Sequence, residues 1–111
     1  MSGNLVDRSC VPCHGGTLAV PAAERRGLLA ELAGWKIEDG LLTRTVAVPD
    51  FASAVRLVDA IAPIADSEGH HPDLRVSYGS LRIDLVTHAI SDLSENDFIV
   101  AAKLNRVLPG F

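Results

Sequence analysis

The feature that most constrains the fold is a pair of runs, residues 73–78 and 81–87, in which apolar and polar side chains alternate. Alternation with a period of two is typical of β-strands that place one face against a core. A two-residue loop separates the runs, and its first residue is Gly79, which is typical of a type II′ turn. The sequence therefore predicts a β-hairpin with Tyr78 opposite Leu81 and with one uniformly apolar face.

The polar face of this predicted hairpin carries charged and titratable partners. In the register set by the turn, Arg75 lies opposite Asp84, a complementary pair, and further along His71 lies opposite His88. Cross-strand partners have Cβ atoms about 4.5–5.5 Å apart, close enough for two imidazole rings to contact one small molecule. Pro72 can interrupt the ladder before His71, but we expect the two histidines to remain neighbours.

Three segments have apolar residues at the spacing of amphipathic helices, and they are expected at 21–33, 51–68 and 95–108. In the second segment the expected core-facing stripe consists of Phe51, Val55, Val58, Ile61, Ala62 and Ala65. Asp50 is a good N-cap for this segment, and Pro63 inside it should remove one hydrogen bond and bend the helix.

Two further strands are expected at 35–38 and 42–48, joined by a turn at Asp39-Gly40. The order of elements is then α-β-β-α-β-β-α, and all the strands can pair antiparallel. This order predicts an α+β fold, a four-stranded antiparallel sheet with helices packed on one face. With 111 residues the chain is expected to form a single domain at 21–111, preceded by a flexible N-terminal arm at 1–20.

The histidines point to acid–base chemistry. Imidazole has an ordinary pKa of about 6.5, so it can give and take protons near neutral pH. Asp66 lies four residues before His70, within reach if the helix persists to Gly69, so we expect Asp66 to hold that ring. Asp97 follows Ser94 at the spacing of a capping box, and its expected role is to cap the third helix. A role for Asp97 in holding a nearby His or Arg is the second interpretation.

The N-terminal segment contains Cys10-Val11-Pro12-Cys13-His14, which fits the pattern of covalent haem attachment. No export signal accompanies the pattern, and a structural zinc site would lack ligands here. We interpret the segment as a surface loop with two ordinary thiols, and thiol redox chemistry is a third interpretation.

Composition and charge exclude some classes of binding partner and indicate a location in the cell. The net charge of −4 and a pI near 5.4 argue against nucleic acid. No apolar run reaches the roughly 20 residues that span a bilayer. Residues 1–8 have no apolar signal core, so we expect a cytoplasmic location and reduced cysteines. The mean hydropathy of +0.24 fits either an Ala- and Val-rich core or apolar surface buried between subunits.

The residues singled out so far fit one spaced motif, and through it the chain resembles the pterin-4a-carbinolamine dehydratases, also called dimerisation cofactor of a homeodomain transcription factor. The residues of this motif, all at the spacing found in the family, are Asp66, His70, His71, Pro72, Tyr78, His88 and Asp97. The Gly34-Trp35 pair and the Cys10/Cys13 segment with Gly15-Gly16 are similar to bacterial members, and the resemblance extends over about 10–108. The chain departs from the family pattern at Asp66 (often Glu), Gly69 (often acidic), Leu74 (often aromatic) and Asn96 (often Arg).

The resemblance implies a lyase that removes water from a 4a-hydroxytetrahydropterin and gives the quinonoid dihydropterin, as in tetrahydrobiopterin recycling. It assigns proton transfer to His70 and His71, and substrate positioning with partial acid–base character to His88. Asp66 and Asp97 are supporting residues in this scheme. The pterin is also expected to contact backbone at Gly69, Val86 and Thr87. No metal or redox cofactor is implied, because the reaction moves only protons and water.

The resemblance also implies a homodimer or a homotetramer, built by sheet extension and by contacts between helices. An alternative function stays open, because members of the family also act as non-catalytic dimerisation or assembly partners of other proteins. Some relatives similar to Rubisco assembly factors lack the catalytic histidines. This chain keeps His70, His71 and His88, which favours the enzyme.

Overall fold

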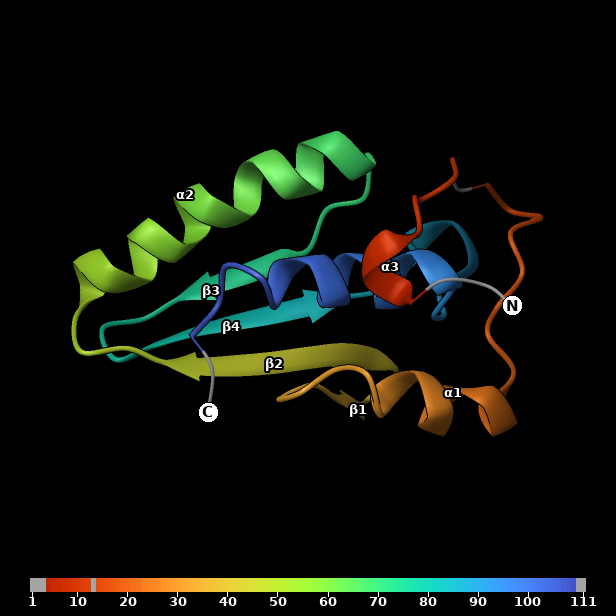
Figure 1. Ribbon diagram of the computed structural model, residues 1–111, viewed down its shortest axis with the longest axis horizontal. Helices are drawn as coiled ribbons and strands as arrows, with labels where there is room; N and C mark the ends of the chain where they lie inside the picture. The colour runs from red at the N-terminus through yellow and green to blue at the C-terminus, as the bar shows by residue number, and fades with distance from the viewer. Residues whose placement is uncertain (1–3, 13, 110–111) are drawn as a thin grey trace.

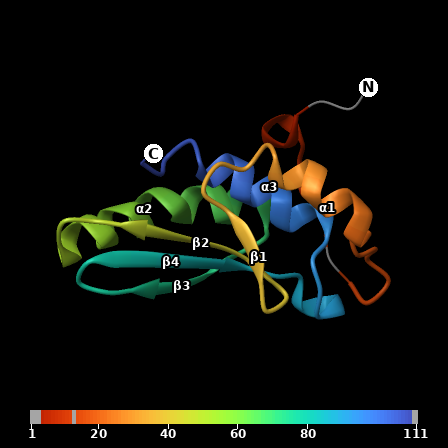
Figure 2. The same cartoon turned by 90° about the horizontal axis from the view of Figure 1, so that it is seen from below.

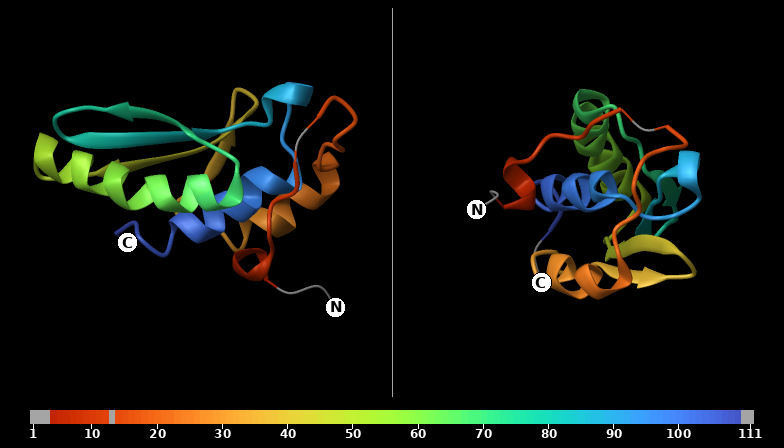
Figure 3. Two further views of the ribbon diagram at one scale, coloured as in Figure 1. Left: turned by 90° about the horizontal axis from the view of Figure 1, so that it is seen from above. Right: turned by 90° about the vertical axis from the view of Figure 1, so that its right-hand side faces the viewer.

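The computed structural model describes residues 4–12 and 14–109. In chain order the elements are η1 (Leu5–Asp7), α1 (Ala22–Leu29), β1 (Lys36–Glu38), β2 (Leu41–Ala47), α2 (Phe51–Glu68), β3 (Asp73–Val76), β4 (Ser80–Leu85), η2 (His88–Ile90) and α3 (Glu95–Leu104). The strands form one antiparallel sheet in the order β1-β2-β4-β3. The α-helices lie on one face of this sheet, with α3 between α1 and α2 (Figures 1 and 3). The predicted α+β fold is confirmed.

The core lies between the sheet and α3. Figure 2 shows the sheet with this layer of helices behind it. The fully buried residues of α3 are Asp97, Phe98, Ile99, Val100, Ala101 and Leu104. They face the apolar side of β4, where Leu81, Ile83 and Leu85 are also fully buried. Because nearly every position of α3 is covered, this helix is the centre around which the other elements pack.

The first hairpin follows its turn chemistry. Asp39 and Gly40 both have positive φ, 52° and 78°, as a type I′ turn requires, and Glu38 pairs with Leu41 across it. The helix before it is shorter than predicted and ends at Leu29. After this helix Trp35 is buried in the core, where its indole Nε1 donates to Asn105 Oδ1 at 2.8 Å.

Helix α2 begins and ends where the sequence predicts. The Asp50 carboxylate accepts the Ser53 N–H at 2.8 Å, and Gly69 ends the helix with a φ of +63°. The helix continues through Pro63. The predicted core-facing stripe is wrong in part, because Phe51 and Val55 are 53% and 38% exposed and Ala62 is exposed too. The buried residues of this helix are Ala54, Ile61 and Ala65.

The second hairpin has a register two residues away from the predicted one. Leu81 pairs with Val76 rather than with Tyr78, and Asp84 pairs with Asp73 rather than with Arg75. Residues 77–79 connect the two strands, and Gly79 lacks the positive φ that a type II′ turn needs. A shift of two residues keeps every side chain on its face, so the apolar face is as predicted and only the partners change.

The beginning of the chain contacts the helix layer. Leu5 in η1 is fully buried and packs against α3. The flexibility of an arm at 1–20 stays a prediction. Cys13, half of the expected thiol pair, lies outside the described residues. Within the described residues, no helix combines the length and the apolar character that crossing a membrane requires.

Candidate active site

His70 and His71, which follow the end of α2, point in different directions. Gly69 reverses the chain, and the His70 N–H donates back to Ala65 O at 3.3 Å. Successive residues of extended chain point to opposite sides. His70 is therefore turned inward, with 8% of its surface exposed, whereas His71 stays exposed.

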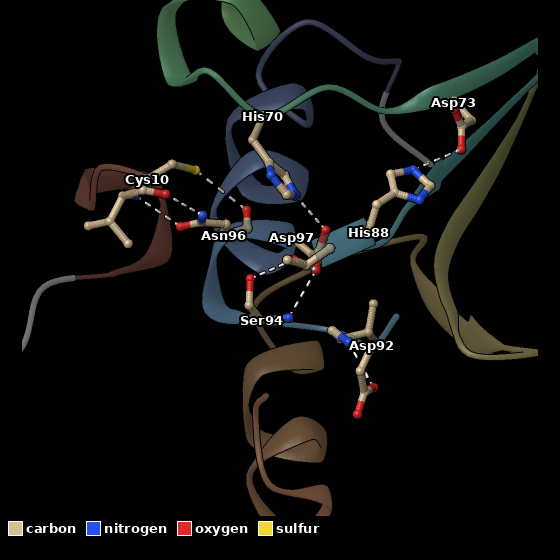
Figure 4. A network of polar contacts seen from close by, with 11 residues as sticks. Cys10, His70, Asp73, His88, Asp92, Ser94, Asn96 and Asp97 are labelled. Atoms are coloured by element: carbon tan, nitrogen blue, oxygen red, sulfur yellow. Dashed lines mark hydrogen bonds and ion pairs between the residues drawn. The ribbon is translucent and has the colours of Figure 1, made fainter. Parts of the chain in front are cut away.

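The inward ring meets a carboxylate of α3. His70 Nε2 lies 2.6 Å from Asp97 Oδ1, and Asp97 is fully buried (Figure 4). The expectation that Asp66 would hold His70 is thus wrong, because the reversal at Gly69 turns His70 away from α2 and towards α3. The second interpretation of Asp97, that it holds a histidine, is the observed one.

Asp97 also caps its helix as predicted. Its Oδ2 accepts the Ser94 N–H at 3.0 Å and the Thr87 hydroxyl at 2.7 Å. The hydroxyls of Thr87 and Ser94 are themselves 2.6 Å apart. A buried carboxylate is costly unless hydrogen bonds compensate it, and this one has partners at both oxygens. The predicted capping box of Ser94 and Asp97 is observed. The side-chain role of Thr87 was missed in the sequence, because Thr87 lies ten residues before Asp97 along the chain.

The outward ring pairs with the last turn of α2. His71 Nε2 lies 2.9 Å from Asp66 Oδ1, and both side chains are exposed. Asp66 therefore holds the neighbour of the histidine for which it was predicted. The helical spacing alone could not show this, because it assumes a helix that continues to residue 70, whereas α2 ends at Glu68.

The third histidine reaches the site from η2 and not from a strand. Strand β4 ends at Leu85, so His88 is not cross-strand to His71 as predicted. Its Nε2 lies 3.8 Å from Asp73 Oδ2, and both side chains are about three-quarters exposed (Figure 4). Sequence reasoning assigned no role to Asp73, because the predicted register placed it opposite Val86.

These residues nevertheless border one depression with a volume of about 340 Å³. Its lining residues are Gly69, His70, His71, Val86, Thr87, His88 and Ala89. All the predicted catalytic and substrate-contacting residues are in this set, while Asp97 and Asp66 bind His70 and His71. The predicted roles of these residues stay predictions.

Fold and site together define a class of protein, a small α+β domain with a depression bordered by three histidines. Comparison with known proteins gives a narrower result. The sequence profile of the family described as Pterin 4 alpha carbinolamine dehydratase matches residues 19–107. The chain belongs to this family.

Similar proteins agree with this membership. A relative from Nitrosomonas eutropha is 41% identical, with 95% of this chain and 94% of the relative covered. One from Dechloromonas aromatica is 42% identical, with 96% of each covered. Both are provisionally named pterin-4-alpha-carbinolamine dehydratase. A crystal structure from Brucella melitensis, titled transcriptional coactivator/pterin dehydratase, superposes with a TM-score of 0.76 at 26% identity, covering 83% of this chain and 100% of that chain.

Proposed function

We propose that the protein is a 4a-hydroxytetrahydropterin dehydratase that works by histidine acid–base catalysis. One observation carries the proposal. Three imidazoles border the same depression, and two of them are hydrogen-bonded to carboxylates from α2 and α3. Membership in the dehydratase family supports the same reaction and supplies the substrate class.

The reaction requires a base and an acid in the site. A base removes the proton from N5 of the pterin, and an acid delivers a proton to the hydroxyl on C4a. The C4a–O bond then breaks, water leaves, and a double bond forms between N5 and C4a. Positioned acid–base groups contribute about 10²–10⁴-fold to such steps. The elimination consumes no electrons, so imidazoles can supply all of the proton transfer.

The geometry suggests a division of work among the histidines. We assign the proton transfers to His70 and His71, which lie side by side in the chain at the rim of the depression. A buried carboxylate such as Asp97 can orient His70 and stabilise the positive charge that appears when the ring takes a proton. His88, which approaches from η2, positions the pterin and adds partial acid–base character. Backbone at Gly69, Val86 and Thr87 would contact the pterin ring.

An assay of carbinolamine dehydration tests the proposal. We expect His71→Ala and His88→Ala each to lower kcat/KM by about 10²-fold or more, because each removes a proton-transfer or positioning group. His14→Ala is the matched control, since His14 is exposed and does not line the depression. Wild-type protein that leaves the carbinolamine to decay at its spontaneous rate would overturn the proposal and would favour the role of a protein partner.

We further propose a homo-oligomer, a dimer or a tetramer. The outer side of α2 exposes Phe51 and Val55, and Tyr78 beside the edge strand β3 is 74% exposed. An apolar groove between α2 and β3, lined in part by Val58 and Leu74, continues this surface. Apolar surface of this kind next to an edge strand is typical of an interface between subunits. A cytoplasmic location stays a prediction.

A further inference from the structure

The N-terminal segment formed by Cys10 and Val11 lies against both elements that hold the His70–Asp97 pair. Figure 4 shows Asn96 between Cys10 on one side and Asp97 on the other, with His70 above them. We propose that this segment is a brace that positions His70 against Asp97, and that Asn96 and Glu68 are the positioning residues through which it acts. The proposal rests on the proposed function, since it concerns the same site.

The first contact point of the brace is Asn96, the second residue of α3. Its side-chain Oδ1 accepts the Val11 N–H at 3.1 Å, and its Nδ2 donates to Val11 O at 2.7 Å. The amide thus binds both main-chain polar groups of one residue, in the way that a neighbouring strand would. Asn96 is only 3% exposed, so water competes little for these two bonds.

The second contact point is Glu68, the last residue of α2. Its Oε1 accepts the Cys10 N–H at 2.9 Å, and its Oε2 accepts Lys103 Nζ of α3 at 2.6 Å. Hydrogen bonds from Lys103 and from Cys10 hold the pKa of the Glu68 carboxyl below its ordinary value. Glu68 is therefore ionised at neutral pH, and it links the arm to the ends of two helices.

The two contact points flank the pair they are proposed to position. Asn96 immediately precedes Asp97, and Glu68 precedes His70 by two residues. Consecutive residues of the arm, Cys10 and Val11, thus join the end of α2 to the start of α3. A hydrogen bond of 2.6 Å between His70 and Asp97 tolerates little displacement of either helix. Support of this kind is how residues outside a site hold its groups in productive geometry.

Asn96→Ala tests the brace, because it removes both bonds to Val11. We expect kcat for the carbinolamine to fall about tenfold with KM within about twofold, since the acid–base group is misplaced while the depression stays open. The second readout is the downfield imidazole N–H proton resonance of His70, identified by its loss in His70→Gln. It should broaden and shift in Asn96→Ala. Glu95→Ala is the matched control, because it removes the exposed Arg8–Glu95 ion pair from the adjacent position.

If Asn96→Ala does not fold, Asn96→Asp replaces it, because it keeps the acceptor for the Val11 N–H and loses the donor to Val11 O. Asn96 variants with the kcat and the His70 resonance of Glu95→Ala would overturn the brace, whatever their stability. A changed His70 resonance that is confined to the Asn96 variants supports it. The His70 resonance tests the brace even if the wild-type protein is inactive. Inactive wild-type protein would overturn the proposed function but would not by itself contradict the brace.

Discussion

At the scale of single residues, Asp97 serves the fold with one oxygen and the site with the other. Oδ2 accepts from Ser94 and Thr87 and so closes the start of α3, while Oδ1 binds His70. A single fully buried carboxylate therefore joins a helix cap, the segment after β4 and the candidate acid–base group. A substitution that removes one hydrogen bond of Asp97 should therefore also weaken its other hydrogen bonds.

Thr87→Val tests this coupling, because it removes the hydroxyl and keeps the shape of the side chain. We expect the free energy of unfolding to fall by about 1–3 kcal/mol, since a buried carboxylate oxygen loses a donor. Dehydratase activity should fall as well, because Asp97 would hold His70 less firmly. Urea denaturation and the activity assay measure the two effects.

The control for that measurement is Thr45→Val on β2, where the side chain is exposed. A Thr87 variant that unfolds and reacts like the Thr45 variant would show that the hydroxyl contributes nothing to Asp97.

At the scale of elements, the ion pair between Glu68 and Lys103 connects α2 to α3. Their side chains are only 10% and 16% exposed and lie 2.6 Å apart. The hydrogen bond from Lys103 is the largest cause of the lowered pKa of Glu68, followed by the Cys10 N–H among the groups that lower it. Because folding lowers this pKa, the contribution of Glu68 to stability is present above its ordinary value of 4.5 and is lost as the pH falls through the folded value.

Glu68→Gln is therefore expected to be pH-dependent in its effect. At pH 7 the variant should be less stable than wild type by about 1–3 kcal/mol, because it loses a charged partner of two donors. The difference should shrink as the pH falls below 4.5 and the carboxyl of Glu68 becomes protonated. Urea denaturation at several pH values measures it, with Glu24→Gln on the exposed side of α1 as control. A difference that is equally large at pH 7 and at pH 3 would contradict the assignment.

At the scale of the whole molecule, one edge of the sheet and an apolar surface of α2 lie next to each other and are uncovered in the described part of the chain. Strand β3 pairs only with β4 and is an edge of the sheet. The outer side of α2 exposes Phe51 and Val55. These residues lie on the same helix as the apolar groove between α2 and β3. A second copy of the chain could cover both surfaces, which would agree with the high mean hydropathy of +0.24.

Light scattering after size exclusion tests this arrangement. We expect the mass of wild type to be a multiple of 11.8 kDa, and we expect Val55→Asp to lower it, because the substitution places a charge in the proposed interface. Leu18→Asp is the control, since Leu18 is 86% exposed and lies on the N-terminal segment, away from α2. A wild-type protein that runs as a monomer, or a mass that responds equally to both substitutions, would count against the interface.

The sequence by itself determined the order of the helices and strands, which face of the second hairpin is apolar, and where α2 begins and ends. These features depend on local chemistry: a cap at Asp50, a glycine with positive φ at Gly69, and alternation along each strand. Tertiary structure decided the partners. A period of two is unchanged by a shift of two residues, so alternation could not choose between Asp73 and Arg75 as the partner of Asp84. Likewise, only the packing of α2 on α3 decides that Asp97, and not Asp66, meets His70, because the two partners are 27 residues apart along the chain.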